Sequence, residues 1–188
     1  MQLAVLASGT GSILAAMWSA GVDVAVVVVD RPCRAVELAA EHGVEARVVE
    51  RSEFGAAFDR DAYSRRLVAT LDEHHIDVVA MAGFGTVLSE PFFDRYEGRV
   101  LNTHPALLPA FPGWHAVRDA LAHGVKVTGC TVHVATLEVD AGPILAQAAV
   151  DVLEDDDEAS LHERIKAVER ELYPRTLQRF LADLEVTT

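Results

Sequence analysis

The run of residues 24–29, Val-Ala-Val-Val-Val-Val, constrains the fold more than any other part of the chain. A short, uninterrupted apolar run rich in β-branched residues is typical of a strand buried on both faces of a parallel sheet. Residues 2–6 read as a similar strand, and a glycine turn and a helix over residues 12–20 separate the two. Strands that alternate with helices predict an α/β fold, with a mostly parallel, twisted sheet flanked by helices and right-handed crossovers.

The alternation changes in the C-terminal part of the chain. The strands expected over residues 125–134 and 144–152 have no helix between them, which predicts an antiparallel part near the C-terminal end. The other expected strands cover residues 47–49, 77–82 and 99–103. The other expected helices cover residues 34–42, 59–74, 117–123 and 157–181, and a further helix opens at Ser89.

The C-terminal helix expected over residues 157–181 contains both an apolar stripe and a helix-breaking residue. Leu161, Ile165, Val168 and Leu172 recur at helical spacing and predict one apolar stripe that faces the core. Pro174 lies inside the same segment, and a mid-helix proline is expected to kink or interrupt the helix.

Length and charge limit the function classes that need to be considered. A chain of 188 residues fits a single domain over residues 1–188. Its formal charge of −13 argues against a nucleic-acid or acidic-membrane partner, although backbone amides could still bind a small anionic substrate. The oligomeric state stays open, with a homodimer as one option.

Targeting and cysteine signals favour the cytoplasm. The N-terminus lacks the basic flank of a signal peptide, and the apolar run 22–29 is too short to span a bilayer. Cys33 and Cys130 lie far apart without metal-type spacing, so free thiols in a reducing compartment are expected.

A glycine-containing turn, Ala-Ser-Gly-Thr-Gly-Ser over residues 7–12, follows the first strand. Its glycines permit close approach of a ligand, and the amides at the start of the next helix attract phosphate. A tight turn without a ligand is equally compatible. A dinucleotide site with Asp30 at the ribose is disfavoured because Leu14 stands where the third fingerprint glycine belongs, so a phosphomonoester fits better.

Asn102 and His104 form the strongest chemical signal. They lie at positions i and i+2 at the end of an expected strand, so both side chains project from one face, ahead of a loop with three prolines. A neutral donor beside a titratable ring suits a carbonyl oxygen that gains negative charge. Asp140 is the candidate carboxylate partner of His104, with Glu138 as the competing acid.

Several motifs together resemble the phosphoribosylglycinamide formyltransferase family, which uses folate in purine synthesis. They are Ser-Gly-Thr-Gly-Ser (8–12), Ala-Gly-Phe (82–84), Asn-Thr-His-Pro-Ala-Leu-Leu-Pro-Ala-Phe-Pro-Gly (102–113), Thr-Val-His (131–133) and Asp-Ala-Gly-Pro-Ile-Leu-Ala-Gln (140–147). The Asn-x-His-Pro segment alone is shared with relatives that formylate other amines or hydrolyse formyltetrahydrofolate.

The resemblance implies a role for each matching position. Asn102, His104 and Asp140 match the catalytic group, and 10-formyltetrahydrofolate is the implied formyl donor, with no metal. The implied contacts to the phosphoribosyl substrate come from Gly11, Ser12, Ile13, Lys166 and Glu169. The implied contacts to the folate come from Arg60, Gly85, Thr86, Val87, Leu88, Thr136, Leu137, Glu138 and Val139.

Some positions depart from the family pattern or leave a second interpretation open. Gly85 and Thr86 stand where the family has Met-Arg, and Ile13 stands where it often has asparagine. From its residue type alone, Glu169 is favoured as a solvated carboxylate opposite the apolar stripe, and Arg60 as a charge at a helix start. His133 matches a histidine close to the active site.

The sequence therefore predicts an enzyme that moves a formyl group from 10-formyltetrahydrofolate to the amine of 5′-phosphoribosylglycinamide. The alternatives are another folate-dependent formyltransferase, a formyltetrahydrofolate hydrolase, a silent folate- or nucleotide-binding homologue and, disfavoured by the glycine pattern, a nucleotide-dependent oxidoreductase.

Overall fold

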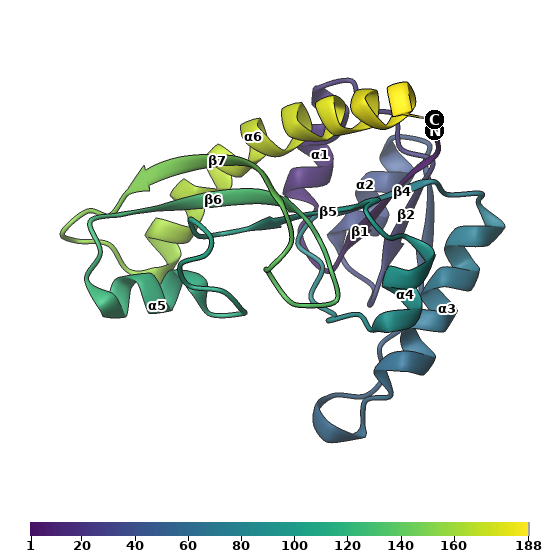
Figure 1. Ribbon diagram of the computed structural model, residues 1–188, viewed down its shortest axis with the longest axis horizontal. Helices are drawn as coiled ribbons and strands as arrows, with labels where there is room; N and C mark the ends of the chain where they lie inside the picture. The colour runs from purple at the N-terminus through teal and green to yellow at the C-terminus, as the bar shows by residue number, and fades with distance from the viewer. Residues whose placement is uncertain (188) are drawn as a thin grey trace. The chain divides into compact units, whose positions relative to one another are not determined.

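The computed structural model describes residues 1–187, which divide into two compact units, Met1–Val100 and Leu101–Thr188. Figure 1 labels most of the helices and strands of the two units. The expected α/β fold is confirmed, because the first unit holds parallel strands and the second holds antiparallel ones.

The first unit is built around four parallel strands in the order β3-β2-β1-β4. They are β1 (Leu3–Ala7), β2 (Val26–Val29), β3 (Glu45–Val48) and β4 (Val78–Met81). Every residue of β1, β2 and β4 is buried, as their apolar composition predicts, whereas β3 is largely exposed at the edge. The strand order reverses between β1 and β4, and ligands of open α/β sheets bind at the carboxyl ends of strands at such a point.

The helices of the first unit begin and end near the expected residues. They are α1 (Ser12–Ser19), α2 (Arg34–Glu41), α3 (Arg60–Glu73) and α4 (Glu90–Arg95), with a 3₁₀ turn η1 (Gly55–Ala57) before α3. Asp59 caps α3, its carboxylate accepting from the Ala62 amide at 2.9 Å. Ser89 precedes α4, although its hydroxyl bonds Arg60 and Ser64 rather than capping the helix.

The second unit is an antiparallel ladder of β5 (Val100–His104), β6 (Val127–Val134) and β7 (Ile144–Asp151). The ladder also contacts α6 (Glu158–Thr187), which packs against β6 and β7, while α5 (Ala116–His123) packs against α6 and ends at Gly124. Strand β5 runs one residue beyond the expected end and so includes His104.

Helix α6 corrects two expectations. It is helical on both sides of Pro174, so the expected interruption is wrong. Tyr173 and Leu177 are fully buried on either side of the proline, and the Tyr173 hydroxyl donates to the Leu101 carbonyl at 3.0 Å, which stabilises the helix against loss of one backbone bond. Val168 is only half-buried, and Glu169 takes its place on the buried face.

Candidate active site

The pairing of β5 with β6 places Asn102 directly opposite His133. The Asn102 Nδ2 lies 3.2 Å from the His133 Nε2. The His133 Nδ1 lies 3.1 Å from the Val134 carbonyl oxygen, which can only accept, so this nitrogen carries the ring hydrogen. Nε2 is then an acceptor for the Asn102 amide. Burial lowers the pKa of His133 against the opposing effects of the Val134 bond and Asp140, and this favours the neutral ring.

His104 is held by acceptors at both ring nitrogens. Its Nδ1 lies 3.2 Å from the Asp140 Oδ2, and its Nε2 lies 2.8 Å from the Phe111 carbonyl oxygen. The Phe111 carbonyl can only accept, so the Nε2 of His104 carries a hydrogen. The Asp140 carboxylate lies beside the other ring nitrogen, and both side chains are more than nine-tenths buried.

Asp140 links the two histidines to the loop that follows β5. Its Oδ1 lies 3.6 Å from the His133 Nε2, and its Oδ2 accepts the Gly113 amide at 2.8 Å. Asp140 adopts a left-handed backbone with φ of 57°, which turns its side chain toward His104. The competing acid, Glu138, is exposed. Within the second unit, Asn102 thus lies beside His133, and Asp140 lies beside both His133 and His104.

The loop after β5 is fixed by two side chains to which sequence reasoning gave no role. The Thr131 hydroxyl donates to the Ala106 carbonyl at 2.7 Å and accepts the Leu108 amide at 3.0 Å. The Gln147 amide donates to the Leu108 carbonyl at 2.9 Å and to the Thr131 hydroxyl at 3.0 Å. Both residues belong to motifs that carried the family resemblance, which was the available signal.

Glu169 is buried at 5% exposure, so the interpretation as a solvated carboxylate is wrong. It follows Leu161 and Ile165 at four-residue spacing on the buried face of α6. Its Oε1 accepts the Thr103 hydroxyl at 2.9 Å. Burial raises the pKa of Glu169, and the Thr103 bond and Lys166 offset this only in part. The Lys166 Nζ lies 3.8 Å from the Glu163 carboxylate.

The candidate phosphate loop begins α1 in the first unit. Gly11 has a φ of 71°, and an added Cβ would lie 2.8 Å from the Leu38 Cδ1, so glycine is required there. The Ile13 side chain is 7% exposed and belongs to the core, so this position offers a ligand only its backbone amide. Ser12 is half-buried at the first position of the helix.

The segment Gly85–Leu88 lies after β4, beside the turn after β1. The Gly85 amide donates to the Ser8 hydroxyl at 2.7 Å, and the Ser8 amide donates to the Gly83 carbonyl at 3.1 Å. Thr86 and Leu88 are buried, whereas Val87 is 43% exposed. In the same unit, Arg60 is an exposed residue at the start of α3.

Asp30 is fully buried and therefore does not present the free carboxylate that a ribose contact needs. Its oxygens accept from Arg31 at 3.0 and 3.1 Å and from the Thr86 hydroxyl at 2.8 Å. Burial alone would raise the pKa of Asp30, but these hydrogen bonds outweigh it and hold the pKa below its ordinary value.

The loop before β7 carries the four remaining candidate folate residues. Thr136, Leu137, Glu138 and Val139 are all exposed, and the Thr136 hydroxyl donates to the Glu138 carbonyl at 3.0 Å. Their exposed side chains are accessible to a ligand.

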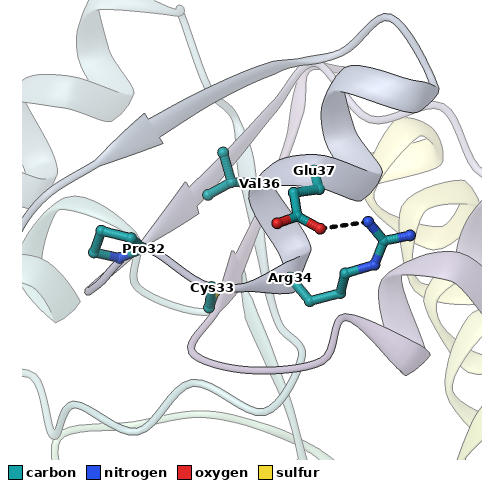
Figure 2. A pocket seen from close by; sticks show the side chains of 5 residues that line it. All are labelled: Pro32, Cys33, Arg34, Val36 and Glu37. Carbon is teal, nitrogen blue, oxygen red and sulfur yellow. Dashed lines mark hydrogen bonds and ion pairs between the residues drawn. The ribbon is translucent and has the colours of Figure 1, made fainter.

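A pocket lies at the start of α2 (Figure 2), next to the turn after β1, because the Ala35 amide donates to the Gly9 carbonyl at 3.2 Å. It is lined by Pro32, Cys33, Arg34, Val36 and Glu37. Arg34 donates to the Glu37 carboxylate at 2.5 Å and to Glu41 at 2.9 Å. The lining guanidinium is therefore already paired with protein carboxylates.

Cys33 and Cys130 are free thiols, as expected.

Two kinds of structural feature are missing from residues 1–187. No group of three or more His, Cys, Asp or Glu side chains is arranged to hold a metal ion. No helix in this part of the chain combines the length and apolarity needed to cross a membrane.

A family model described as formyl transferase matches residues 1–177. The chain belongs to the formyl transferase family. Phosphoribosylglycinamide formyltransferase of Mycobacterium tuberculosis is 52% identical to it over 176 residues, which cover 91% of this chain and 80% of that protein. The trifunctional purine biosynthetic protein adenosine-3 of Drosophila melanogaster is 40% identical over 185 residues, or 94% of this chain and 14% of that longer protein.

Solved structures agree with this membership. Glycinamide ribonucleotide transformylase 1 from Symbiobacterium toebii matches with a TM-score of 0.87 at 40% identity, covering 94% of this chain and 85% of that one. The resemblance to phosphoribosylglycinamide formyltransferases is thereby confirmed for this member of the formyl transferase family.

Proposed function

We propose that this formyl transferase moves the formyl group of 10-formyltetrahydrofolate to the amino group of 5′-phosphoribosylglycinamide in de novo purine synthesis. The observation that carries the proposal is the group formed by the half-buried Asn102 and the buried side chains of His104 and Asp140, with the His104 Nδ1 3.2 Å from Asp140. Membership in a family whose relatives bear this name supports it.

The cluster suits an acyl transfer in which charge develops on one oxygen. The substrate amine attacks the formyl carbon, and the carbonyl oxygen gains negative charge. Asn102 and the imidazolium of His104 stabilise that oxygen with N–H groups. The His104 Nε2 now donates to the Phe111 carbonyl, and a formyl oxygen is an acceptor of the same kind that takes over this N–H in the complex.

Asp140 assists the proton transfer that accompanies attack by the substrate amine. Its carboxylate stabilises the imidazolium, and it moves the proton of the attacking amine through water to N10 of the folate. The new C–N bond forms as the bond from the formyl carbon to N10 breaks, so tetrahydrofolate leaves protonated. One oxyanion donor contributes about 10²- to 10³-fold in rate. General acid–base assistance contributes about 10²- to 10⁴-fold, and the two effects overlap here.

The remaining candidate residues bind the two substrates. In the proposal the amides of Gly11, Ser12 and Ile13 hold the phosphate, and Lys166 and Glu169 hold the ribose hydroxyls. The folate contacts are those of Arg60, of the segment Gly85, Thr86, Val87 and Leu88, and of the segment Thr136, Leu137, Glu138 and Val139.

Further parts of the proposal concern the whole chain. Both compact units form one formyltransferase domain over residues 1–188, which the family match over 1–177 supports. The proposed reaction uses no metal, nucleic acid or membrane, and we place the enzyme in the cytoplasm, with a homodimer as one option for its assembly.

A turnover assay tests the function. A 10-formylfolate analogue is followed spectroscopically with 5′-phosphoribosylglycinamide, with other amines and with water as acceptors. We expect deformylation that depends on 5′-phosphoribosylglycinamide and a formylated product. Deformylation at the same rate in water indicates a hydrolase, transfer to another amine indicates a different formyltransferase, and binding without turnover indicates a silent homologue.

A further inference from the structure

Gln147 is an exposed residue of β7, the strand at one edge of the antiparallel ladder. The β5–β6 pairing sets His104 opposite Thr131, and the β6–β7 pairing sets Thr131 opposite Gln147. Residues that pair across neighbouring strands project to the same face of a sheet, so these three side chains form one row across the ladder. The exposed end of the row is therefore connected to the His104 ring two strands away.

The Gln147 amide uses both of its hydrogens to hold the loop after β5. Its Nε2 donates to the Leu108 carbonyl at 2.9 Å and to the Thr131 hydroxyl at 3.0 Å. The hydroxyl also accepts the Leu108 amide at 3.0 Å and donates to the Ala106 carbonyl at 2.7 Å. A hydroxyl has one hydrogen and two lone pairs, so all three are in use. Removing the Gln147 amide takes a donor from both Leu108 and Thr131.

Close packing holds the same loop against the ladder. A Cβ added to Gly129 would lie 2.8 Å from the Leu107 Cδ2 and 2.0 Å from the Ala148 carbonyl oxygen. Glycine is therefore needed at this position of β6. Gly129 precedes Thr131 by two residues, so the packing of Leu107 and the hydrogen bonds of Thr131 lie on the same face of the strand.

The far end of the loop contacts both members of the proposed catalytic pair. The Phe111 carbonyl accepts from the His104 Nε2 at 2.8 Å, and the Gly113 amide donates to the Asp140 Oδ2 at 2.8 Å. Phe111 has a left-handed backbone with φ of 52°, a strained conformation that persists only where the surrounding structure fixes it. Leu108 precedes Phe111 by three residues, so the anchor at Leu108 determines where these two contacts lie.

We propose that Gln147 is a positioning residue for formyl transfer: by holding Leu108 and Thr131, it fixes the loop that orients His104 and Asp140. The inference rests on the proposed function, because it takes those two residues as catalytic. Substitutions of exposed residues usually have little effect, so a marked loss of turnover at this edge strand is a distinctive expectation. Misplacing a catalytic group by a change remote from the chemistry costs up to about 10²-fold in rate.

Histidine NMR tests the positioning without depending on turnover. The protein is labelled with ¹⁵N-histidine, and the Nε2–H signal of His104 is identified by its loss in His104→Ala. This hydrogen is buried and bonded to the Phe111 carbonyl, and we expect it to exchange with water about tenfold faster in Gln147→Leu and in Gln147→Glu. Neither replacement donates to the Leu108 carbonyl at neutral pH. Asp151→Asn, on the same face of β7 and also exposed, is the matched control and should exchange as the parent does.

A double-mutant cycle measures the effect on transfer. Gln147→Leu should lower kcat about tenfold with little change in the KM for 5′-phosphoribosylglycinamide, and the loss should disappear in a His104→Ala background. Additive losses mean that Gln147 only supports the fold, and an unchanged Nε2–H exchange rate means that it does not position the ring; either overturns the proposal. Failure of the proposed function is distinct, because the parent then transfers no formyl group while the exchange rate of the His104 Nε2–H still responds to Gln147.

Discussion

The side-chain nitrogens of Asn102 and His133 lie 3.2 Å apart across the β5–β6 ladder. Since His133 uses its Nδ1–H on the Val134 carbonyl, its Nε2 fixes which end of the Asn102 amide points toward it. Asn102 is therefore oriented by a residue that need not touch the substrate.

His133→Phe should reduce kcat about tenfold, the typical effect of one lost hydrogen bond, with little change in either KM. Steady-state kinetics measures the change. A double-mutant cycle provides the control: the effect should disappear in an Asn102→Ala background, because the amide to be oriented is gone. Additive losses would place His133 outside this interaction.

His104→Ala should lower kcat about 10²- to 10³-fold, because it removes an N–H that stabilises the developing oxyanion. Binding of 5′-phosphoribosylglycinamide, measured by calorimetry, should stay close to that of the parent. Turnover at the parent rate is incompatible with the role assigned to this ring.

Asp140→Asn should lower kcat about 10²-fold, because an amide cannot take up the proton of the attacking amine as the carboxylate is proposed to do. The carboxylate lies 3.2 Å from the His104 ring, and asparagine keeps nearly the same volume there, so binding of 5′-phosphoribosylglycinamide should change little. Steady-state kinetics measures the rate, and calorimetry measures the binding. A rate equal to that of the parent would show that the carboxylate takes no part in the transfer.

Glu169→Gln should change how stability depends on pH. The raised pKa of Glu169 means that the folded state holds its proton more tightly than the unfolded state does. The parent therefore loses stability as pH rises from about 4.3, the ordinary carboxyl value, through the raised value. Glutamine does not titrate, so the advantage of E169Q in urea unfolding should grow across that window and then level off. A constant difference between the two proteins would show that Glu169 titrates normally.

Gly11→Ala should destabilise the protein by about 1–2 kcal/mol from the left-handed backbone alone, and more where Cβ meets Leu38. Gly9→Ala is the matched control in the same turn, since a Cβ there has no atom within 4 Å and the backbone is not left-handed. The free energies of unfolding of the two variants are compared in urea. Equal effects would remove the steric argument for Gly11.

Local patterns were sufficient to predict much of the fold. The β-branched run of β2, the caps at Asp59 and Gly124 and the missing helix between β6 and β7 each identify an element or its end. The interruption predicted at Pro174 was wrong, because the buried packing of Tyr173 and Leu177 stabilises the helix more than the loss of one backbone hydrogen bond destabilises it. Such packing between distant segments is not encoded in a local window.

Because local patterns do not encode contacts between distant segments, only some parts of the site were predictable. Asn102 and His104 are neighbours on one strand, so their common face follows from the sequence. The burial of Glu169 depends on its contact with Thr103, which lies 66 residues away in the sequence. Charged residues are mostly solvated, so the sequence alone favours an exposed Glu169, whereas its side chain is buried.

The left-handed backbone of Asp140 restricts which residue types can occupy this position. Aspartate and asparagine tolerate this conformation better than other side chains do, and only the first of them is an acid. Glutamate would keep the charge but strain the main chain and overshoot the imidazole, while glycine would relax the main chain and abolish the charge. The residue at position 140 must therefore satisfy two independent requirements, a left-handed backbone and a carboxylate charge. A substitution that fails the first impairs folding, and one that fails the second impairs turnover.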